Sequence, residues 1–162
     1  MMTHKALVAL TIACVASFVA PATNADAGVK ARKQLVKRAK SQRGTKYRYG
    51  GESPQRGFDC SGFTRWTFEK VTGLPHSSMQ QYRLARKSGY KRVNRRPRLH
   101  RGDLVFFKTT RAKVGHAGMY IAQGKFIHAS SGADKVTVSS VYDKYYYGPR
   151  FRGAVRVPKL RR

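Results

Sequence analysis

Two alternating segments, residues 116–121 and 125–130, constrain the fold more than any other feature of the chain. In both, apolar residues recur at every second position, which is the period of a strand with one buried face. Paired as a hairpin, the segments place only apolar side chains on one face, namely Ala117, Met119, Ile121, Ile127 and Ala129. Such a face must be buried, so the hairpin predicts a sheet that is covered by other elements.

The register of this hairpin decides where two histidines point. A two-residue turn at Gln123-Gly124 would put His116 and His128 on opposite faces, because a slip of one residue turns a strand over. A three-residue loop at residues 122–124 instead puts both on one face as diagonal neighbours, about 7–8 Å apart, with Gly118 beside them. We expect the three-residue loop, because it keeps the apolar face together and gives the glycine the left-handed position that such loops favour.

Helices precede strands along the chain. Apolar residues at helical spacing predict a first helix over residues 29–43 and a second from Asp59 or Cys60 to about Thr72, with Gly73 as its C-cap. Ser77 can cap a short third helix. The period then changes to that of strands, which we expect at residues 104–107, 116–121, 125–130, 136–139 and 150–157. This order is typical of an α+β domain in which an antiparallel sheet packs against the helices.

The N-terminus has the three parts of an export signal in order. Lys5 precedes an uncharged apolar stretch at residues 6–20, and Ala25-Asp26-Ala27 offers a small-x-small cleavage site. We therefore expect residues 1–27 to be a signal peptide, removed on export to the periplasm, the cell wall or the medium, which leaves no transmembrane span in the mature chain. The alternatives are a retained anchor and a lipoprotein, since Cys14 lies inside the apolar stretch.

The expected mature chain consists of a basic helical segment, residues 28–46, and one main domain, residues 47–162. Its single cysteine, Cys60, cannot form a disulfide within the chain and is a candidate reactive thiol. The net charge of +27 survives signal removal, because Lys5 and Asp26 are lost together. Such a charge favours anionic partners, and outside the cytoplasm these are the polymers of the envelope. Nucleic acid is the rival partner, but no nucleic-acid-binding module accompanies the charge.

Cys60, His116 and His128 form a candidate nucleophilic site. The thiol begins the expected second helix, where free N–H groups and the helix dipole would stabilise a thiolate. Ser61 and Gly62 follow it and are small enough to let a substrate backbone approach. One histidine can take the thiol proton while the other orients it.

Metal binding is the alternative use of the same side chains. Cys60, His116 and His128 would be three ligands and His76 or His100 a fourth, but no close ligand pair of the structural zinc type is present. A carboxylate pair suited to glycosidase chemistry and a phosphate-binding loop are both absent from the sequence.

Four stretches resemble the NlpC/p60 family of cell-wall peptidases in order and spacing. They are YRYGG at 47–51, GFDCSGF at 57–63, LHRGDLVFF at 99–107, and GHAGMYI at 115–121 followed by FIHAS at 126–130. The resemblance implies a papain-like fold and a cysteine peptidase without cofactor, in which residues 47–162 form the catalytic domain. Its substrates would be amide bonds of peptidoglycan stem peptides, commonly between γ-D-glutamate and a diamino acid such as diaminopimelate, or cross-links in some relatives.

The resemblance also implies roles for individual residues. Cys60 matches the nucleophile, His116 the base and His128 the third polar residue. Tyr47 matches a tyrosine that lines the active site, and Asp59 and Ser61 match residues that contact the polar ends of the substrate.

The chain departs from the family pattern in two ways. His76 follows Leu74-Pro75 where the family normally has arginine, and no separate wall-binding module is present, a role that the basic surface would take over. Two other hypotheses stay open at this point: an inactive wall-binding relative, and a basic protein that acts on nucleic acid or membranes.

Overall fold

The structure, a computed structural model, describes residues 24–160. Most of the expected signal peptide, including Cys14, lies outside the described residues. The first helix, α1 (Asn24–Lys40), begins ahead of the expected cleavage point after Ala27 and ends three residues earlier than predicted. Within the described part of the chain, no helix is long and apolar enough to cross a membrane.

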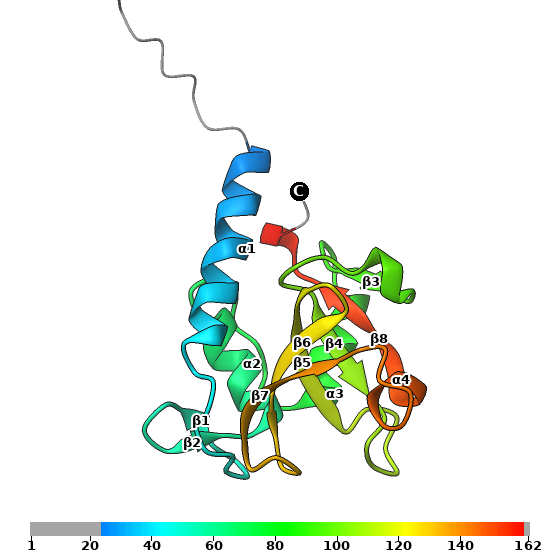
Figure 1. The fold of residues 1–162 in the computed structure, drawn as a ribbon. Coiled ribbons are helices and arrows are strands. Elements are labelled where there is room, and N and C mark those ends of the chain that lie inside the picture. The colour runs from blue at the N-terminus through cyan, green and yellow to red at the C-terminus, as the bar shows by residue number, and fades with distance from the viewer. Residues whose placement is uncertain (1–23, 161–162) are drawn as a thin grey trace, which may run out of the picture.

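A six-stranded antiparallel sheet forms the centre of the molecule, in the order β3-β8-β4-β5-β6-β7 (Figure 1). The strands are β3 (Lys91–Val93), β4 (Leu104–Phe107), β5 (His116–Ala122), β6 (Lys125–Ser130), β7 (Lys135–Ser140) and β8 (Phe151–Arg156). The expected strands β4 to β8 are all confirmed, within one or two residues at their ends. The short β3 was not predicted, because three residues are too few to show a period.

The remaining elements surround this sheet. The helices are α1, α2 (Cys60–Phe68), α3 (Ser78–Arg83) and α4 (Tyr147–Arg150), and the small hairpin is β1 (Glu52–Ser53) with β2 (Gly57–Phe58). Short 3₁₀-helices lie at η1 (Leu84–Arg86), η2 (Arg96–Arg98) and η3 (Pro158–Leu160). Figure 1 shows α1 and α2 on one side of the sheet, so the predicted α+β architecture is confirmed.

The sheet is buried on both faces. In β4, Leu104 and Phe106 belong to the larger core, which includes Phe63 of α2, whereas Val105 and Phe107 belong to a second core on the other face. All four residues of this strand are fully buried, so it reads as a continuous apolar run. The predicted apolar face of the hairpin, Ala117 to Ala129, lies in the larger core as expected.

The second helix is shorter than predicted. It begins at Cys60 as expected but ends at Phe68, and Gly73 is not its cap. The N–H groups of Val71 and Thr72 both turn back to the Phe68 carbonyl, which tightens the last turn. The chain leaves the helix here because Leu74, only 4% exposed, has to reach the core.

The turn of the β5–β6 hairpin corrects the sequence prediction. It has two residues, Gln123 and Gly124, both with positive φ (49° and 71°), and Ala122 pairs with Lys125 across it. Ile121 is then an extra residue on β5, and this β-bulge shifts the register so that Tyr120 faces Phe126 and Met119 faces Ile127. The bulge thereby restores the register that a three-residue loop would have produced. His116 and His128 share a face as predicted, although the predicted loop was wrong.

Candidate active site

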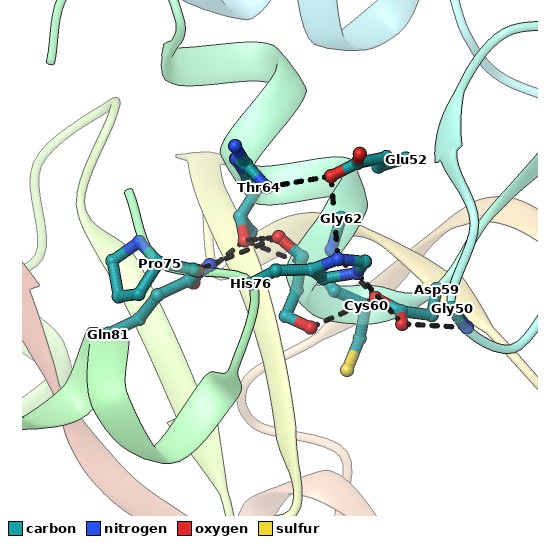
Figure 2. Close-up of polar contacts among 11 residues, drawn as sticks. Gly50, Glu52, Asp59, Cys60, Gly62, Thr64, Pro75, His76 and Gln81 are labelled. Carbon is teal, nitrogen blue, oxygen red and sulfur yellow. Dashed lines mark hydrogen bonds and ion pairs between the residues drawn. The ribbon is translucent and has the colours of Figure 1, made fainter. Parts of the chain in front are cut away.

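Cys60 is the first residue of α2, and Asp59 caps that helix. The Asp59 backbone is extended (φ −87°, ψ 176°), and its Oδ1 accepts a hydrogen bond of 2.7 Å from the Gly62 N–H. The backbone N–H groups of Ala117, Ser61 and Cys60 itself are directed at the sulfur, so the thiol lies between the helix start and β5. Figure 2 shows the sulfur projecting from the start of this helix.

Gly62 has a different role from the one predicted. A Cβ at this position would lie 2.0 Å from the carbonyl oxygen of Gly51, so the protein's own backbone fills the space that we expected a substrate to use. Gly51 is equally constrained, since its Cβ would lie 2.4 Å from the Gly57 carbonyl oxygen. These close approaches hold the 48–58 loop against the start of α2 and fix the position of Cys60.

The Asp59 carboxylate accepts four hydrogen bonds and is only 9% exposed. Oδ1 accepts from the Ser61 hydroxyl (2.9 Å) as well as Gly62, and Oδ2 accepts from the Gly50 N–H (3.0 Å) and from His76 Nε2 (3.1 Å). A carboxylate has about four acceptor positions, so Asp59 is saturated within the protein. Asp59 and Ser61 therefore stabilise the helix start, and their contact with a substrate stays a prediction.

His116 and His128 meet across the hairpin. The His116 Nε2 lies 2.8 Å from the His128 Nδ1, and the His128 Nε2 lies 2.9 Å from the Ser139 Oγ on β7. His128 is fully buried and stacks on Phe126, with ring centroids 4.6 Å apart. The second histidine thus holds the first and is itself held by a hydroxyl and an aromatic ring.

Tyr147 closes this cluster from the opposite side. Its ring meets the rings of His128 and His116 with centroids 5.2 and 5.9 Å away, and its hydroxyl is hydrogen-bonded to the Ser130 side chain. Sequence reasoning missed Tyr147 and Ser139. The one available signal for Ser139 was its alternation within the strand expected at 136–139, whereas Tyr147 lies in a tyrosine run that has no period.

Burial favours the neutral forms of the Cys60 thiol and of both imidazoles. It raises the pKa of Cys60 to about 11; backbone N–H groups oppose this and the Asp59 charge adds to it. Burial lowers the pKa of His116 to about 4, against the pull of Asp59, and burial followed by the His116 charge lowers the pKa of His128. Cys60 and His116 nevertheless keep part of their surface exposed, which a substrate requires.

Tyr47 lies at the same site. Burial first, and then the charges of Cys60 and Asp59, raise the pKa of its phenol. The strand-like pairing of Tyr47 with Phe58 and its N–H bond to the Asp134 carbonyl hold it there. The structure thus brings Tyr47 together with the residues that the sequence singled out.

The two remaining histidines lie in different places. His76 is hydrogen-bonded to Asp59 and so belongs to the site. His100 is exposed near the other end of β5, where the Gly102 N–H donates a hydrogen bond to the Tyr120 carbonyl. Within residues 24–160, no three histidine, cysteine or acidic side chains converge in a way that could hold a metal ion.

The candidate site thus combines a cysteine at a helix start with a histidine pair on the adjoining antiparallel sheet, and the fold is papain-like. The sequence model of the NlpC/P60 family matches residues 44–156, which is more than half of the chain. The chain therefore belongs to the NlpC/P60 family.

Relatives with assigned names support this membership. The chain is 40% identical over 126 residues to a Haemophilus influenzae protein named "Probable endopeptidase NlpC homolog", covering 76% of this chain and 62% of that protein. It is 36% identical over 115 residues to the gamma-DL-glutamyl hydrolase of Bacillus subtilis, covering 69% of this chain and 26% of the relative. It is 33% identical over 131 residues to the murein DD-endopeptidase MepH of Escherichia coli, covering 79% of this chain and 46% of the relative. The chain thus spans less than two thirds of each of these proteins.

The fold agrees with solved structures. The peptidoglycan hydrolase RipB of Mycobacterium tuberculosis superposes with a TM-score of 0.64 at 28% identity, covering 86% of this chain and 73% of that chain.

Proposed function

We propose that the protein is an exported peptidoglycan endopeptidase in which Cys60 is the nucleophile and His116 the base. The observation that carries the proposal is the hydrogen-bonded chain from His116 through His128 to Ser139. Because Nε2 of His116 is engaged by His128, Nδ1 is the nitrogen left to take the thiol proton. His116 Nε2–H then donates to His128 Nδ1, and His128 Nε2–H donates to the Ser139 oxygen, so every ring nitrogen has one role.

The reaction follows from these positions. The Cys60 proton moves to His116 Nδ1 as the sulfur attacks the amide carbonyl, and the oxyanion is stabilised by backbone N–H groups at the start of α2. The C–N bond breaks as His116 returns the proton to the leaving amine, which leaves a thioester on Cys60. Water, deprotonated by His116, then hydrolyses the thioester and restores the thiol.

The bond cut is proposed from the relatives. Their names state a gamma-glutamyl hydrolase and a DD-endopeptidase, so both kinds of bond occur among proteins similar to this one. We propose the amide between γ-D-glutamate and the diamino acid as the substrate bond, with Tyr47 lining its subsite, and a stem-peptide cross-link as the alternative.

Replacing Cys60 tests this proposal. Cys60→Ser and Cys60→Ala should abolish release of fragments from purified stem peptides, measured by mass spectrometry, and leave the circular dichroism spectrum unchanged. A chelator should not affect the unaltered protein. Undiminished turnover in either variant would exclude the thiol mechanism, and strong inhibition by the chelator would favour metal catalysis instead. The masses of the products identify the bond.

A second, separate activity is proposed for the basic surface, namely capture of anionic envelope polymers. A groove of about 500 Å³ lies between α1 and the β5–β6 turn and is lined by five cationic side chains and no acidic one. They are Lys33, Lys37, Lys40, Arg101 and Lys125. Among residues 24–160, none of the five forms an ion pair with a carboxylate.

The spacing of the lysines supports a polyanionic ligand. Lys33, Lys37 and Lys40 follow one another at helical neighbour positions on α1, where each like-charged pair costs about 0.2–0.5 kcal/mol. A bound polyanion would remove this repulsion. The groove lies at the end of the hairpin remote from His116, some six residues or roughly 20 Å along β5, so polymer capture would leave the thiol accessible.

A further inference from the structure

His76 lies between two carboxylates beside the nucleophile (Figure 2). In the loop between α2 and α3, its Nε2 is 3.1 Å from Asp59 Oδ2 and its Nδ1 is 3.4 Å from Glu52 Oε2. The same Glu52 oxygen pairs with Arg65 on α2 at 2.8 Å. The result is a row of alternating charge, Arg65, Glu52, His76 and Asp59, that ends at the cap of the cysteine helix.

The chemistry of this row requires a charged ring. Ionised carboxylates only accept hydrogen bonds, so both nitrogens of His76 can satisfy their partners only when both carry a proton. In the neutral ring, one nitrogen would direct a lone pair at a carboxylate. The ring is 26% exposed, so it lies at the edge of the site and not in the core.

Asp59 connects His76 to the thiol. Its other three hydrogen bonds come from Gly50, Ser61 and Gly62 and fix it at the helix start. Its negative charge lies close enough to Cys60 to raise the pKa of the thiol, and thus opposes formation of the thiolate. A positive charge on His76, its fourth hydrogen-bond partner, would offset that negative charge.

We propose that His76 is a positioning residue of the thiol site: as an imidazolium bridging Asp59 and Glu52, it holds the helix cap and offsets the Asp59 charge so that Cys60 ionises more readily. The inference rests on the proposed function only in treating Cys60 as the nucleophile. The groups that face the ring are Asp59, Glu52 with its partner Arg65, and Cys60 beyond Asp59. Without a positive charge at this position, ionisation of the thiol becomes harder.

The test measures the thiol directly, without a substrate. The full chain is treated with iodoacetamide at neutral pH, and alkylation of Cys60 is followed by mass spectrometry of its tryptic peptide, residues 57–65. His76→Arg keeps a permanent charge at the position, and His76→Gln keeps a hydrogen-bond donor without charge. His100→Gln is the matched control, because it removes a histidine remote from the site.

The two variants should differ in rate. Because one charge at a partly exposed site is worth on the order of 1 kcal/mol, we expect His76→Gln to react roughly 3- to 10-fold more slowly than His76→Arg. The unaltered protein should react like His76→Arg, because its ring bridges the same two carboxylates as a cation. His100→Gln should match the unaltered protein.

Other rates would overturn the inference. If His76→Gln reacts as fast as His76→Arg, or if the unaltered protein reacts like His76→Gln, the charge of His76 does not act on Cys60. Should His76→Gln fail to fold, His76→Asn replaces it: this variant is also uncharged and should react as slowly, and a rate equal to that of His76→Arg would contradict the bridge. Stem-peptide hydrolysis is scored separately, so an inactive protein with the expected alkylation rates would overturn the proposed function alone.

Discussion

At the scale of single residues, the site depends on a glycine that brings two strands together. A Cβ at Gly118 would lie 2.7 Å from the Phe126 ring, 2.9 Å from the Ile127 carbonyl oxygen and 3.0 Å from the His128 Cβ. The carbonyl oxygen belongs to the backbone of a central strand and cannot move away cheaply. The sequence predicted that Gly118 leaves room for another group beside the histidines, and the structure fills this room with β6 itself: the Phe126 ring, the Ile127 carbonyl and the His128 Cβ.

We therefore expect Gly118→Ala to displace His128 and to lower kcat/KM for stem peptides by about 100-fold, since a misplacement of about 1 Å has that effect. Overpacking should also destabilise the fold by about 1–3 kcal/mol. Gly73→Ala is the matched control, because its Cβ would meet nothing within 4 Å. Steady-state kinetics and urea unfolding of both variants check the prediction, and normal activity in Gly118→Ala would show that His128 need not occupy this position.

The buried histidines also predict how stability depends on pH. His116 has a folded-state pKa of about 4, below the roughly 6.5 of an unfolded histidine, so the unfolded chain binds more protons between those values. Stability should thus be complete above about pH 6.5 and fall as pH drops towards 4, with up to about 3 kcal/mol from His116 and a further loss from His128.

Cys60 acts at the alkaline end. Its pKa, raised from 9.0 to about 11, makes the folded state hold a proton that the unfolded chain releases, so stability should decline again above about pH 9. Thermal unfolding across this pH range measures the loss of stability at both the acid and the alkaline end. His128→Gln should reduce the acid loss, and Cys60→Ala should reduce the alkaline loss. An acid loss of the same size in His128→Gln and in the unaltered protein would assign that loss to other groups.

At the scale of elements, a buried ion pair joins two central strands. Arg156 at the end of β8 donates two hydrogen bonds of 2.8 Å to Asp103, which directly precedes β4, and the residues are 6% and 1% exposed. Asp103 also accepts from the His100 N–H, and Arg156 also donates to the Arg98 carbonyl. The pair therefore fixes where β4 begins and how the 98–103 segment enters the sheet.

Breaking this pair should be costly. Asp103→Leu leaves a buried guanidinium without its partner and should lower the free energy of unfolding by about 3–5 kcal/mol in urea titrations. Asp103→Leu combined with Arg156→Met should recover much of the loss, because no buried charge remains. Glu69→Gln, which breaks the exposed pair with Arg38, should cost no more than about 1 kcal/mol. Equal losses in the buried and exposed variants would contradict the role of burial.

The elements also show what sequence can and cannot determine. The pattern of apolar residues located β4 to β8 and the start of α2: β4 is a continuous apolar run because both of its faces are buried, whereas the hairpin of β5 and β6 repeats apolar residues at every second position. It could not distinguish the true β5–β6 turn from the predicted one: a bulge at Ile121 and a two-residue turn produce the same faces as a three-residue loop.

The sequence could likewise predict only part of the candidate site. Cys60, His116 and His128 could be selected by their side-chain chemistry alone. Ser139 and Tyr147 could not, because only the folded chain brings β7 and α4 against the β5–β6 hairpin.

At the scale of the whole molecule, two features lie at opposite ends of one hairpin: the thiol site at the start of β5, and the basic groove at the β5–β6 turn. Exposed charges more than about 8 Å apart are largely screened at physiological salt, so capture of a polyanion by the groove should weaken as salt rises. The thiol site, whose groups are in contact and partly buried, should respond much less. Salt should therefore release the protein from sacculi and slow their digestion, while hydrolysis of a small soluble stem peptide falls little.

The groove can be separated from charge in general by a matched pair of variants. Lys33→Gln, Lys37→Gln and Lys125→Gln together remove three charges from the groove, and the same change at the exposed lysines 87, 91 and 108 removes three charges elsewhere. If the groove captures the polymer, the first variant should lose sacculus binding at physiological salt by about tenfold more than the second, because only there do the charges converge on one ligand. Both should cleave soluble stem peptide at the normal rate, as neither alters the thiol site.

Equal losses of binding would mean that the net charge of +27, rather than the groove, holds the protein to the wall. Binding that persists at high salt in both variants would point instead to recognition of the peptide itself at Cys60.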